Sequence, residues 1–585
     1  MRRRLFRDFR FAQIPKHRSC LLTALSILLV GPCLAGQVTK TLADGVTLTQ
    51  IIQPDGPDAM VVNVLKLDTK NPNVKLEAAL AGDTVLADDP TGGRETVSKL
   101  VARKGALAGV NADFFPYSGD PLGLAIVNGD LVSEPYAGRS VVGISRGGWV
   151  LFDKLTFSGR LTAANGACFK ISGINRARGP NELICYSPSF GCPTPNKNDC
   201  VDVLLSTAPA SLPPNAPVTG VVQQVTCGPG STVPAGGLIL SANGLAAKFL
   251  SDNLRMGDKV TLRFDLISEM GKNWTPVVQA VGGGPWLVKG GQIALDGDLQ
   301  KFSGSLINDR HPRTAVGMTA KKELLLVTVD GRQWISRGMT LDELARLMQS
   351  LGAVTAINLD GGGSTAMSVR GMLVNSPSEG AERLVANALI VRELQPASGS
   401  PDIRFSVSQL SAQAGVAQRL TLLDATTGRA LDQSTLSRVV WGARGCRGFA
   451  NQWGLFVPLR PGNGYVVATL GDKRAEIPVT VTIGPPTSLT AVLKPDPSGD
   501  PNRGLVEAKL TDGAGNAISG QVVSITVIGG ISDFTEVVTD NKGIAVFTVT
   551  WDAACDPATC SVAVSSGKVT PVTVTYPQVK APSLE

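Results

Sequence analysis

The segment from residue 312 to residue 370 constrains this chain more than any other, because it predicts two strands, a helix and a further strand. TAVGMTA and ELLLVTVDG are typical of two strands joined by a turn. MTLDELARLMQSLGA predicts an amphipathic helix, in which Thr340 and Glu343 form a capping box. AVTAINLD then predicts a strand that delivers Asp360 and three glycines at its carboxyl end. Since α/β proteins bind ligands at such strand ends, the segment predicts a site as well as a fold.

The residues after this strand combine one acid, free backbone N–H groups and two hydroxyls. Glycines let a backbone approach a ligand closely and point several N–H groups at an anion. No lysine follows the glycines, so the motif is not a phosphate-binding P-loop. A strained turn at the end of a strand is the alternative interpretation. The candidate substrate-binding and catalytic residues here are Asn358, Asp360, Gly361, Gly362, Gly363, Ser364 and Thr365.

Two further strand ends carry residues of the same kind. VGGGPW places Gly283 and Gly284 after a strand, where they predict either a bulge or a second loop lining the same cleft. GVNADFF ends a strand with Asn111 and Asp113, which share a face if the strand continues. An Asx turn that caps the strand is the alternative for this pair.

The loop DRHPRTAVG gathers Arg310, His311 and Arg313 just before a strand. Forked guanidinium groups suit a phosphate or a carboxylate, although an exposed basic loop is the alternative interpretation. His17 and His311 are the only histidines, and His17 lies in the N-terminal segment. This scarcity excludes a multi-histidine metal site, and a Ser-His-Asp triad would have to use His311. We predict no metal-binding residues.

The N-terminus predicts a cleaved signal peptide over residues 1–35. A basic stretch precedes the apolar run CLLTALSILLVGPCLAG, which is short for a membrane span and contains Pro32. Residues 1–35 contribute +6 to the formal net charge of +7, which leaves +1 for the remainder. The remainder is therefore nearly neutral, and we expect no nucleic-acid partner. An exported protein, periplasmic or secreted, is predicted.

The length of the chain and its glycine- and proline-rich segments predict several domains. With 65 glycines, 37 prolines and 585 residues, the chain is too long for one core. We expect an α+β catalytic domain at 36–395, a mixed β-sheet with helices, that contains a cysteine-rich insertion at 161–235. Two all-β Ig-like sandwiches at 402–483 and 489–578 are expected to follow the PASGSP linker.

Eight cysteines remain after the predicted signal peptide, and in an exported chain they predict disulfides. The pair Cys555 and Cys560, which flanks the turn DPAT, is the clearest candidate. Connectivity within the cluster at 168–227 stays open. The spacings form no paired CxxC knuckles, so the cysteines do not predict a zinc site.

Taken together, these motifs resemble the phosphodiester glycosidase family over residues 90–393. The resemblance also rests on GLAIVNGDLV and INR, which add Asn128 and Arg176 as substrate-binding candidates, and on RLVANALIV at 383–391. It implies hydrolysis of a sugar-1-phosphodiester, similar to a GlcNAc-1-phosphodiester, at the glycosidic bond, which releases free sugar and leaves a phosphomonoester. It implies that Asp360 or Asp113 stabilises the oxocarbenium-like transition state or activates water, while Arg313 and the glycine loop hold the phosphate and His311 assists.

No cofactor is expected for this reaction, and a divalent cation is left open. The expected partner is a glycan or glycoconjugate of the bacterial envelope or an exopolysaccharide. The last module resembles bacterial Ig-like or invasin-type repeats, which suggests contact with cell-surface glycans. Two competing hypotheses remain. One is a metal-dependent phosphodiesterase on the same scaffold, and the other is a non-catalytic glycan-binding or adhesive protein.

Overall fold

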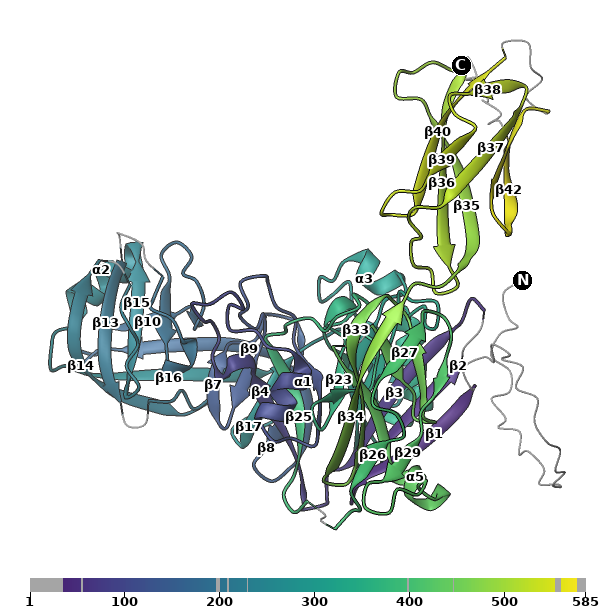
Figure 1. Cartoon of the computed structure of the whole chain (residues 1–585). Helices are drawn as coiled ribbons and strands as arrows, with labels where there is room; N and C mark the ends of the chain where they lie inside the picture. Colours follow the sequence, from purple (N-terminus) through teal and green to yellow (C-terminus); the bar gives the residue numbers. More distant parts are fainter. Residues whose placement is uncertain are drawn as a thin grey trace. The chain divides into compact units, whose positions relative to one another are not determined.

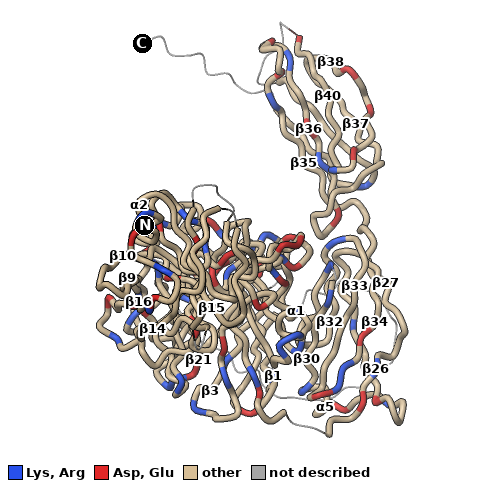
Figure 2. Tube along the Cα trace, turned by 90° about the vertical axis from the view of Figure 1, so that its left-hand side faces the viewer, with Lys and Arg blue, Asp and Glu red and all other residues tan. Residues whose placement is uncertain are grey.

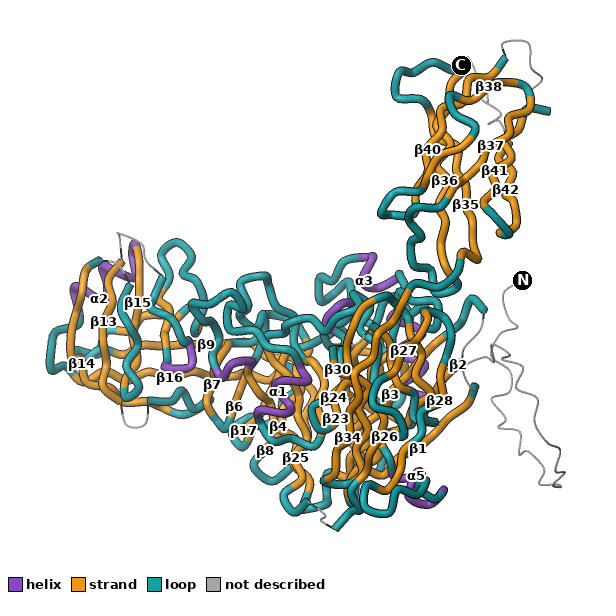
Figure 3. Tube along the Cα trace, viewed as in Figure 1, coloured by secondary structure: helices purple, strands orange, loops and turns teal. Residues whose placement is uncertain are grey.

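Strands dominate the chain (Figures 1 and 3), and account for 49% of its structure against 9% for helix. The computed structural model describes residues 35–53, 56–195, 200–207, 210–228, 230–396, 399–445, 447–552 and 559–575. The predicted signal peptide at 1–35 falls almost entirely outside these residues. The described residues contain five short α-helices: α1 (Val97–Arg103), α2 (Gly244–Asn253), α3 (Gly304–Asn308), α4 (Leu341–Ser350) and α5 (Gln433–Arg438).

The prediction of an α+β catalytic domain is therefore wrong. Strand-like alternation runs through nearly all of residues 36–395, and the helices between the strands span only 5 to 10 residues each. Helices this short cover little of the sheets, and one large buried cluster instead joins residues of different sheets. No helix in the described part of the chain is long and apolar enough to cross a membrane.

An eight-stranded sheet carries most of the segment at 312–370. Its strands, in spatial order, are β1 (Gly36–Ala43), β2 (Val46–Gln53), β3 (Met60–Asp68), β21 (Glu323–Val329), β20 (Arg313–Thr319), β22 (Ala353–Asn358), β18 (Trp286–Lys289) and β19 (Gln292–Ile293). Both β21 and β22 pair antiparallel with β20, so they run in the same direction with β20 between them. Helix α4 makes the crossover from β21 to β22.

Helix α4 forms as its sequence predicts. The Thr340 side chain accepts a hydrogen bond from the Glu343 N–H, and the Glu343 side chain accepts one from the Thr340 N–H, which completes the capping box. Leu341, Leu344 and Met348 are buried in the core shared with β18 and β22. Gly352 adopts φ +89° just after the helix, a conformation that favours glycine.

A second sheet has twelve strands and holds most of residues 125–282. Eleven of them follow the spatial order β11 (Gly173–Ile174), β12 (Leu183–Tyr186), β15 (Gly237–Asn243), β13 (Cys200–Thr207), β14 (Pro217–Cys227), β16 (Lys259–Ser268), β9 (Val150–Thr162), β8 (Ser140–Ser145), β17 (Val277–Gly282), β6 (Ala125–Val127) and β7 (Asp130–Ser133), and β10 (Cys168–Ile171) pairs with β9. A hairpin turn at Asn128–Gly129 joins β6 to β7, and both residues have positive φ.

The cysteines of the 168–227 cluster are free thiols, which corrects the expectation of disulfides there. Cys185 on β12 and Cys200 on β13 are held apart by β15, which pairs with both strands. The Cys200 thiol instead donates to the Gly228 carbonyl at 2.9 Å. Cys555 lies outside the described residues, so the Cys555–Cys560 disulfide stays a prediction.

A third sheet has nine strands drawn from distant parts of the chain. Its order is β27 (Leu410–Gln413), β34 (Lys473–Thr482), β33 (Gly462–Leu470), β30 (Val440–Arg444), β24 (Met372–Leu373), β23 (Met367–Val369), β5 (Ala108–Asn111), β25 (Asn387–Glu393) and β4 (Val74–Leu80). Leu373 on β24 pairs with Ala443 on β30, so the sheet continues across the linker predicted at 396–401.

Small sheets complete the region at 402–483: β26 (Ile403–Phe405) pairs with β29 (Leu422–Asp424), and β28 (Gln418–Arg419) is joined through β32 (Leu455–Pro458) to β31 (Gly448–Ala450). The last two sheets are β35 (Pro486–Pro495), β36 (Arg503–Asp512), β40 (Ile544–Trp551) and β38 (Gly530–Ser532), and β39 (Glu536–Val538), β37 (Val522–Ile528), β41 (Ser561–Ser566) and β42 (Val569–Thr575). They share one core around Phe547. Acidic and basic residues are interspersed along the described part of the trace (Figure 2).

Candidate active site

The carboxyl end of β22 meets the beginnings of its two neighbours at one edge of the eight-stranded sheet. Leu359 donates its N–H to the Thr314 carbonyl at 2.8 Å, which ties the end of β22 to the beginning of β20. On the other side, Gly284 donates its N–H to the Asn358 carbonyl at 2.7 Å. The loops that carry Asp360, Arg313 and the Gly282–Gly284 turn therefore lie next to one another at this edge.

A pocket of about 330 Å³ opens at this edge. Its charged lining consists of Arg313, Arg332, Arg383 and Asp360, with His311 beside them. Ser303 and Ser305 contribute hydroxyls from the beginning of α3, and Gly361, Gly362 and Gly363 form part of the wall. Three guanidinium groups around one carboxylate create a site that suits an anionic substrate.

Asp360 is the carboxylate of this pocket and is half-buried in its wall. Its Oδ1 accepts the Gly361 N–H at 2.9 Å, and Ser364 hydrogen-bonds to the same carboxyl group. Burial raises the pKa of Asp360 to about 6, against the opposing effects of these hydrogen bonds and of the Arg383 charge. A carboxylate with such a pKa is ionised at neutral pH and is basic enough to accept a proton from water.

The glycines after Asp360 are required by close contacts. A Cβ atom at Gly361 would lie 2.8 Å from the Pro312 carbonyl oxygen, and one at Gly363 would overlap the side chains of Arg383 and Glu379. Gly362 has φ +60° and donates its N–H to the Pro312 carbonyl at 2.9 Å. The loop thus packs tightly on the residues before β20, within the short 3₁₀-helix η3 (Gly362–Ser364).

Arg313 is buried at the floor of the pocket, with 2% of its surface exposed. Its guanidinium donates to the carbonyls of Met339, Leu306 and Asp309 at 2.7 to 2.8 Å. Burial, together with the nearby Arg332 charge, lowers the pKa of Arg313 to about 10, so the group stays cationic at neutral pH. The pocket floor therefore has a fixed positive charge.

His311 lies at the rim and is half-buried. Arg332 donates to His311 Nδ1 at 3.0 Å, which requires that nitrogen to be an unprotonated acceptor. Burial and the charges of Arg313 and Arg332 lower the pKa of His311. At neutral pH the ring is neutral with its proton on Nε2.

Asp113 does not line the pocket but is buried behind it, with 3% of its surface exposed. Its carboxylate accepts the N–H groups of Gly123 and Phe114, both at 2.8 Å. Burial raises the pKa of Asp113 to about 7, and the charge of Asp360 also acts to raise it. The two acids are thus electrostatically coupled neighbours.

Two asparagines hold the loops of the site together. Asn111 donates from Nδ2 to the Asp360 carbonyl at 2.6 Å and accepts from the Thr314 hydroxyl at 2.8 Å. Asn358 donates to the Gly284 and Leu359 carbonyls at 2.9 and 2.7 Å. The buried Asn358 Oδ1 and Thr365 Oγ1 have no hydrogen-bond partner among the described residues.

Three residues that the sequence predicts for substrate binding lie elsewhere. Arg310 forms ion pairs with Glu343 at 2.5 Å and Asp58 at 2.9 Å, away from the lining of the pocket. Arg176 pairs with Glu134 and Glu182 in the twelve-stranded sheet. Asn128 forms the β6–β7 turn, where its Oδ1 accepts from Gln279.

Gly283 and Gly284, which the sequence also predicts for substrate binding, pack beneath the pocket rather than line it.

Two arginines and one packing residue of the site were not predicted from the sequence. Arg332 follows Asp330 and Gly331 at the carboxyl end of β21, a position that signals the same sheet edge. Arg383 comes from a loop before β25, and no local pattern indicates that it returns to the site. Arg139 lies over the rings of Phe114 and Phe302 at 5.4 and 4.3 Å, and its charge acts to lower the pKa of Asp113.

Comparisons with known proteins agree with this geometry. A sequence model of the phosphodiester glycosidase family matches residues 215–392. An N-acetylglucosamine-1-phosphodiester alpha-N-acetylglucosaminidase of Mus musculus is 33% identical over 160 residues, which is 26% of this chain and 30% of that protein. A prophage-derived uncharacterized protein of Bacillus subtilis is 37% identical over 108 residues, 18% of this chain and 16% of its own length.

The similarity extends to the fold of a solved structure. A hypothetical protein from Synechocystis superposes with a TM-score of 0.50 at 21% identity, covering 60% of this chain and 62% of its own. At that identity the match concerns the fold alone. This chain spans less than a third of the length of the two curated relatives.

Proposed function

Residues 215–392 belong to the phosphodiester glycosidase family, and from this premise we propose that the protein hydrolyses a sugar-1-phosphodiester at its glycosidic bond. The observation that carries the proposal is the pocket in which Asp360 faces three arginines. A phosphodiester is an anion joined to an uncharged ring, and it needs a cationic subsite next to a carboxylate.

The reaction follows from this arrangement of charges. The oxygen of a water molecule bonds to the anomeric carbon, and the bond from that carbon to the phosphate oxygen breaks with its electron pair on the phosphate. The products are a free sugar and a phosphomonoester. As the bond breaks, positive charge develops on the sugar and negative charge on the phosphate. Asp360 stabilises the former, while Arg313, Arg332 and Arg383 stabilise the latter.

Asp360 has a second proposed role, as the base that accepts the proton of the attacking water. Asp360 is half-buried and accessible to water, whereas Asp113 is buried. The neutral His311 ring can donate a hydrogen bond from its Nε2–H to the departing phosphate oxygen, without giving up the proton. Asp113 has a supporting role, because its carboxylate is occupied by the Gly123 and Phe114 N–H groups.

The test is hydrolysis of a GlcNAc-α-1-phosphate diester in ¹⁸O-labelled water, with and without EDTA. We expect the label in the sugar, and we expect Asp360→Asn to lower kcat about 10²–10⁴-fold, the range for loss of a general base. Asp342→Asn is the matched control, since Asp342 lies on the exposed face of α4, paired with Arg346. Label in the phosphate product, lost on chelation, would instead identify a metal-dependent phosphodiesterase.

We also propose that the protein acts after export, on glycans of a bacterial envelope or exopolysaccharide. The basic and apolar N-terminal sequence supports export. Fractionation of a producing bacterium tests this: we expect the protein in periplasm or medium, shortened by about 35 residues. Full-length protein confined to the cytoplasm would contradict it.

A further inference from the structure

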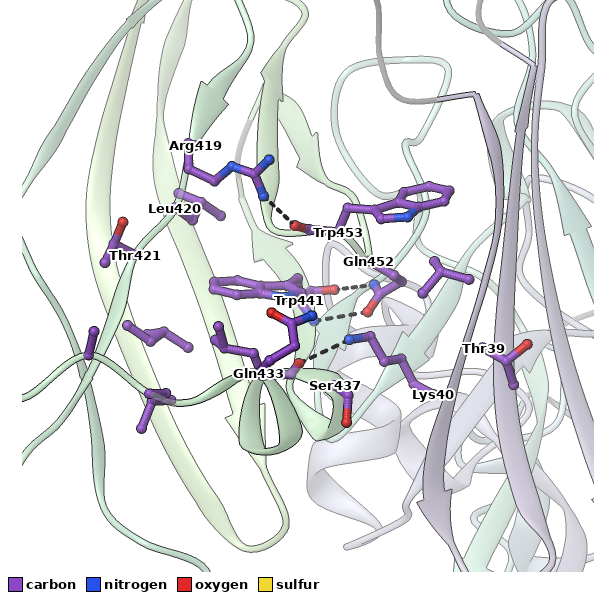
Figure 4. Close-up of a pocket in the computed structure, with 15 residues that line it drawn as sticks. Thr39, Lys40, Arg419, Leu420, Thr421, Gln433, Ser437, Trp441, Gln452 and Trp453 are labelled. Atoms are coloured by element: carbon purple, nitrogen blue, oxygen red, sulfur yellow. Dashed lines mark hydrogen bonds between the residues drawn. The ribbon is translucent and has the colours of Figure 1, made fainter. Parts of the chain in front are cut away.

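A second pocket, of about 570 Å³, lies between strand β1 and the region around residues 419–453 (Figure 4). It shares no lining residue with the Asp360 pocket. Thr39 and Lys40 of β1 form one wall, and residues of β28, β30 and α5 form the others. Its volume falls within the range of about 300–1,000 Å³ that is typical of small-ligand sites.

Lys40 is the most unusual group in this pocket, because its side chain is buried with only 4% of the residue exposed. Its ammonium donates to the Leu436 carbonyl of α5 at 3.1 Å (Figure 4). No ion pair with a carboxylate is formed by Lys40 within the described residues, and burial lowers its pKa to about 8. A buried ammonium with one carbonyl partner keeps unused donors and is costly to the fold unless an anion binds it.

Arg419 adds a second cation at the mouth of the pocket. Its guanidinium donates to the Trp453 backbone carbonyl at 3.0 Å, and the half-buried Trp453 indole extends from the other side of that residue (Figure 4). Lys40 and Arg419 are the charged residues of the lining, and no described carboxylate shares it. The pocket therefore selects for negative charge.

The uncharged lining indicates what carries that charge. Gln433 offers an amide group, and the Ser437 oxygen can accept a hydrogen bond while its proton is donated to the Ser434 carbonyl, which suits a ligand with hydroxyl donors (Figure 4). The Trp453 indole offers a flat apolar surface, which suits the face of a pyranose ring. We infer that this pocket binds an acidic oligosaccharide, with separate carboxylates at Lys40 and at Arg419 and a sugar ring on Trp453.

Titration calorimetry of the full chain with trisaccharides of galacturonic or glucuronic acid tests the inference at low ionic strength. We expect binding of at least one of them, and no binding of the neutral galactose or glucose trisaccharide. Lys40→Met, which keeps the aliphatic stem, should weaken binding at least tenfold and leave the thermal midpoint unchanged or raised. Arg419→Gln and Trp453→Ala should each weaken binding as well.

Two control variants check that binding depends on this pocket. Lys321→Met removes an exposed lysine on the β20–β21 turn, and Arg332→Gln alters the Asp360 pocket; neither should change the affinity. Failure of both acidic trisaccharides to bind would overturn the inference. So would equal binding of the neutral trisaccharides, unchanged binding by Lys40→Met, or equally tight binding of inorganic phosphate or triglutamate.

Discussion

At the scale of single residues, Asp113 determines which side chains its neighbours can carry. A Cβ atom at Gly282 would overlap its Oδ2, and one at Gly123 would lie 2.8 Å from the same atom. Both glycines have ordinary negative or extended φ, so close packing rather than backbone conformation requires them. The buried acid, Gly282 at the end of β17 and Gly123 in the loop before β6 therefore form one packed unit behind the candidate active site.

Gly282→Ala is expected to destabilise the protein by about 1–3 kcal/mol, the usual cost of overpacking. Thermal unfolding measures this, and hydrolysis assays should show a parallel loss of activity because the adjoining Gly283–Gly284 turn supports Asn358. Gly236→Ala is the control, since a Cβ atom there has no neighbour within 4 Å. An unchanged midpoint for Gly282→Ala would show that the Asp113 carboxylate can move aside.

The pKa of Asp360 predicts how the proposed activity depends on pH. The base must be deprotonated, so kcat/KM should be level above its pKa of about 6 and should fall tenfold per pH unit below it. Because the Arg383 charge lowers this pKa, Arg383→Gln should move the acid limb to higher pH. A pH–rate profile of both proteins measures the shift. An acid limb that Arg383→Gln leaves in place would assign it to another group.

At the scale of elements, the loop before β20 sends its two arginines in different directions. Arg310 joins α4 through Glu343, whose side chain also completes the helix capping box. Arg313, three residues later, enters β20 and turns its guanidinium into the pocket floor. The loop is thereby fixed to the helix on one side and supplies the site on the other.

Arg310 lies outside the pocket, whereas Arg332 lines it. Substitutions at these two arginines should therefore have opposite effects on activity and stability. Arg310→Met should leave kcat/KM unchanged and lower the free energy of unfolding by less than about 1 kcal/mol, as for other surface ion pairs. Arg332→Met should leave stability unchanged and lower kcat/KM about tenfold, through loss of one hydrogen bond to a charged group. Steady-state kinetics and urea unfolding of both variants decide this. A reversed pattern would restore Arg310 as the substrate-binding residue.

Local signals were sufficient where one short segment determines the structure. The capping box and apolar face of α4, and the positive φ values at Asn128–Gly129, depend on neighbours within a few residues. The fold class depended on more: the sequence predicts α4 correctly, but the shortness of the helices and the pairing of strands across hundreds of residues decide that β-structure dominates. Arg332 directly follows β21, so its place at the sheet edge could be predicted from the local sequence. Arg383 reaches the site through a loop, and no local pattern predicts its position.

At the scale of the whole molecule, the nine-stranded sheet links the candidate catalytic region to residues 440–482. Leu373 pairs with Ala443, and Val440 and Val467 belong to the same buried cluster as Met372. Gln452 donates its N–H to the buried Gln50 side chain at 2.9 Å. Composition shifts at the linker predicted a domain boundary, but strand pairing across a linker has no local signature.

The shared sheet predicts different outcomes for two truncations. A chain that ends at residue 396 loses β30, which leaves β24 as an open sheet edge and exposes the apolar residues packed against β30. Open apolar edges promote aggregation, so this chain should be insoluble or unfold at a lower temperature. A chain that ends at residue 484 keeps the whole nine-stranded sheet and should retain hydrolytic activity and the main unfolding transition. Expression, size-exclusion chromatography and calorimetry of both chains measure the difference. If the shorter chain were monomeric and fully active, residues 402–483 would be an independent domain whose pairing with β24 contributes little to stability.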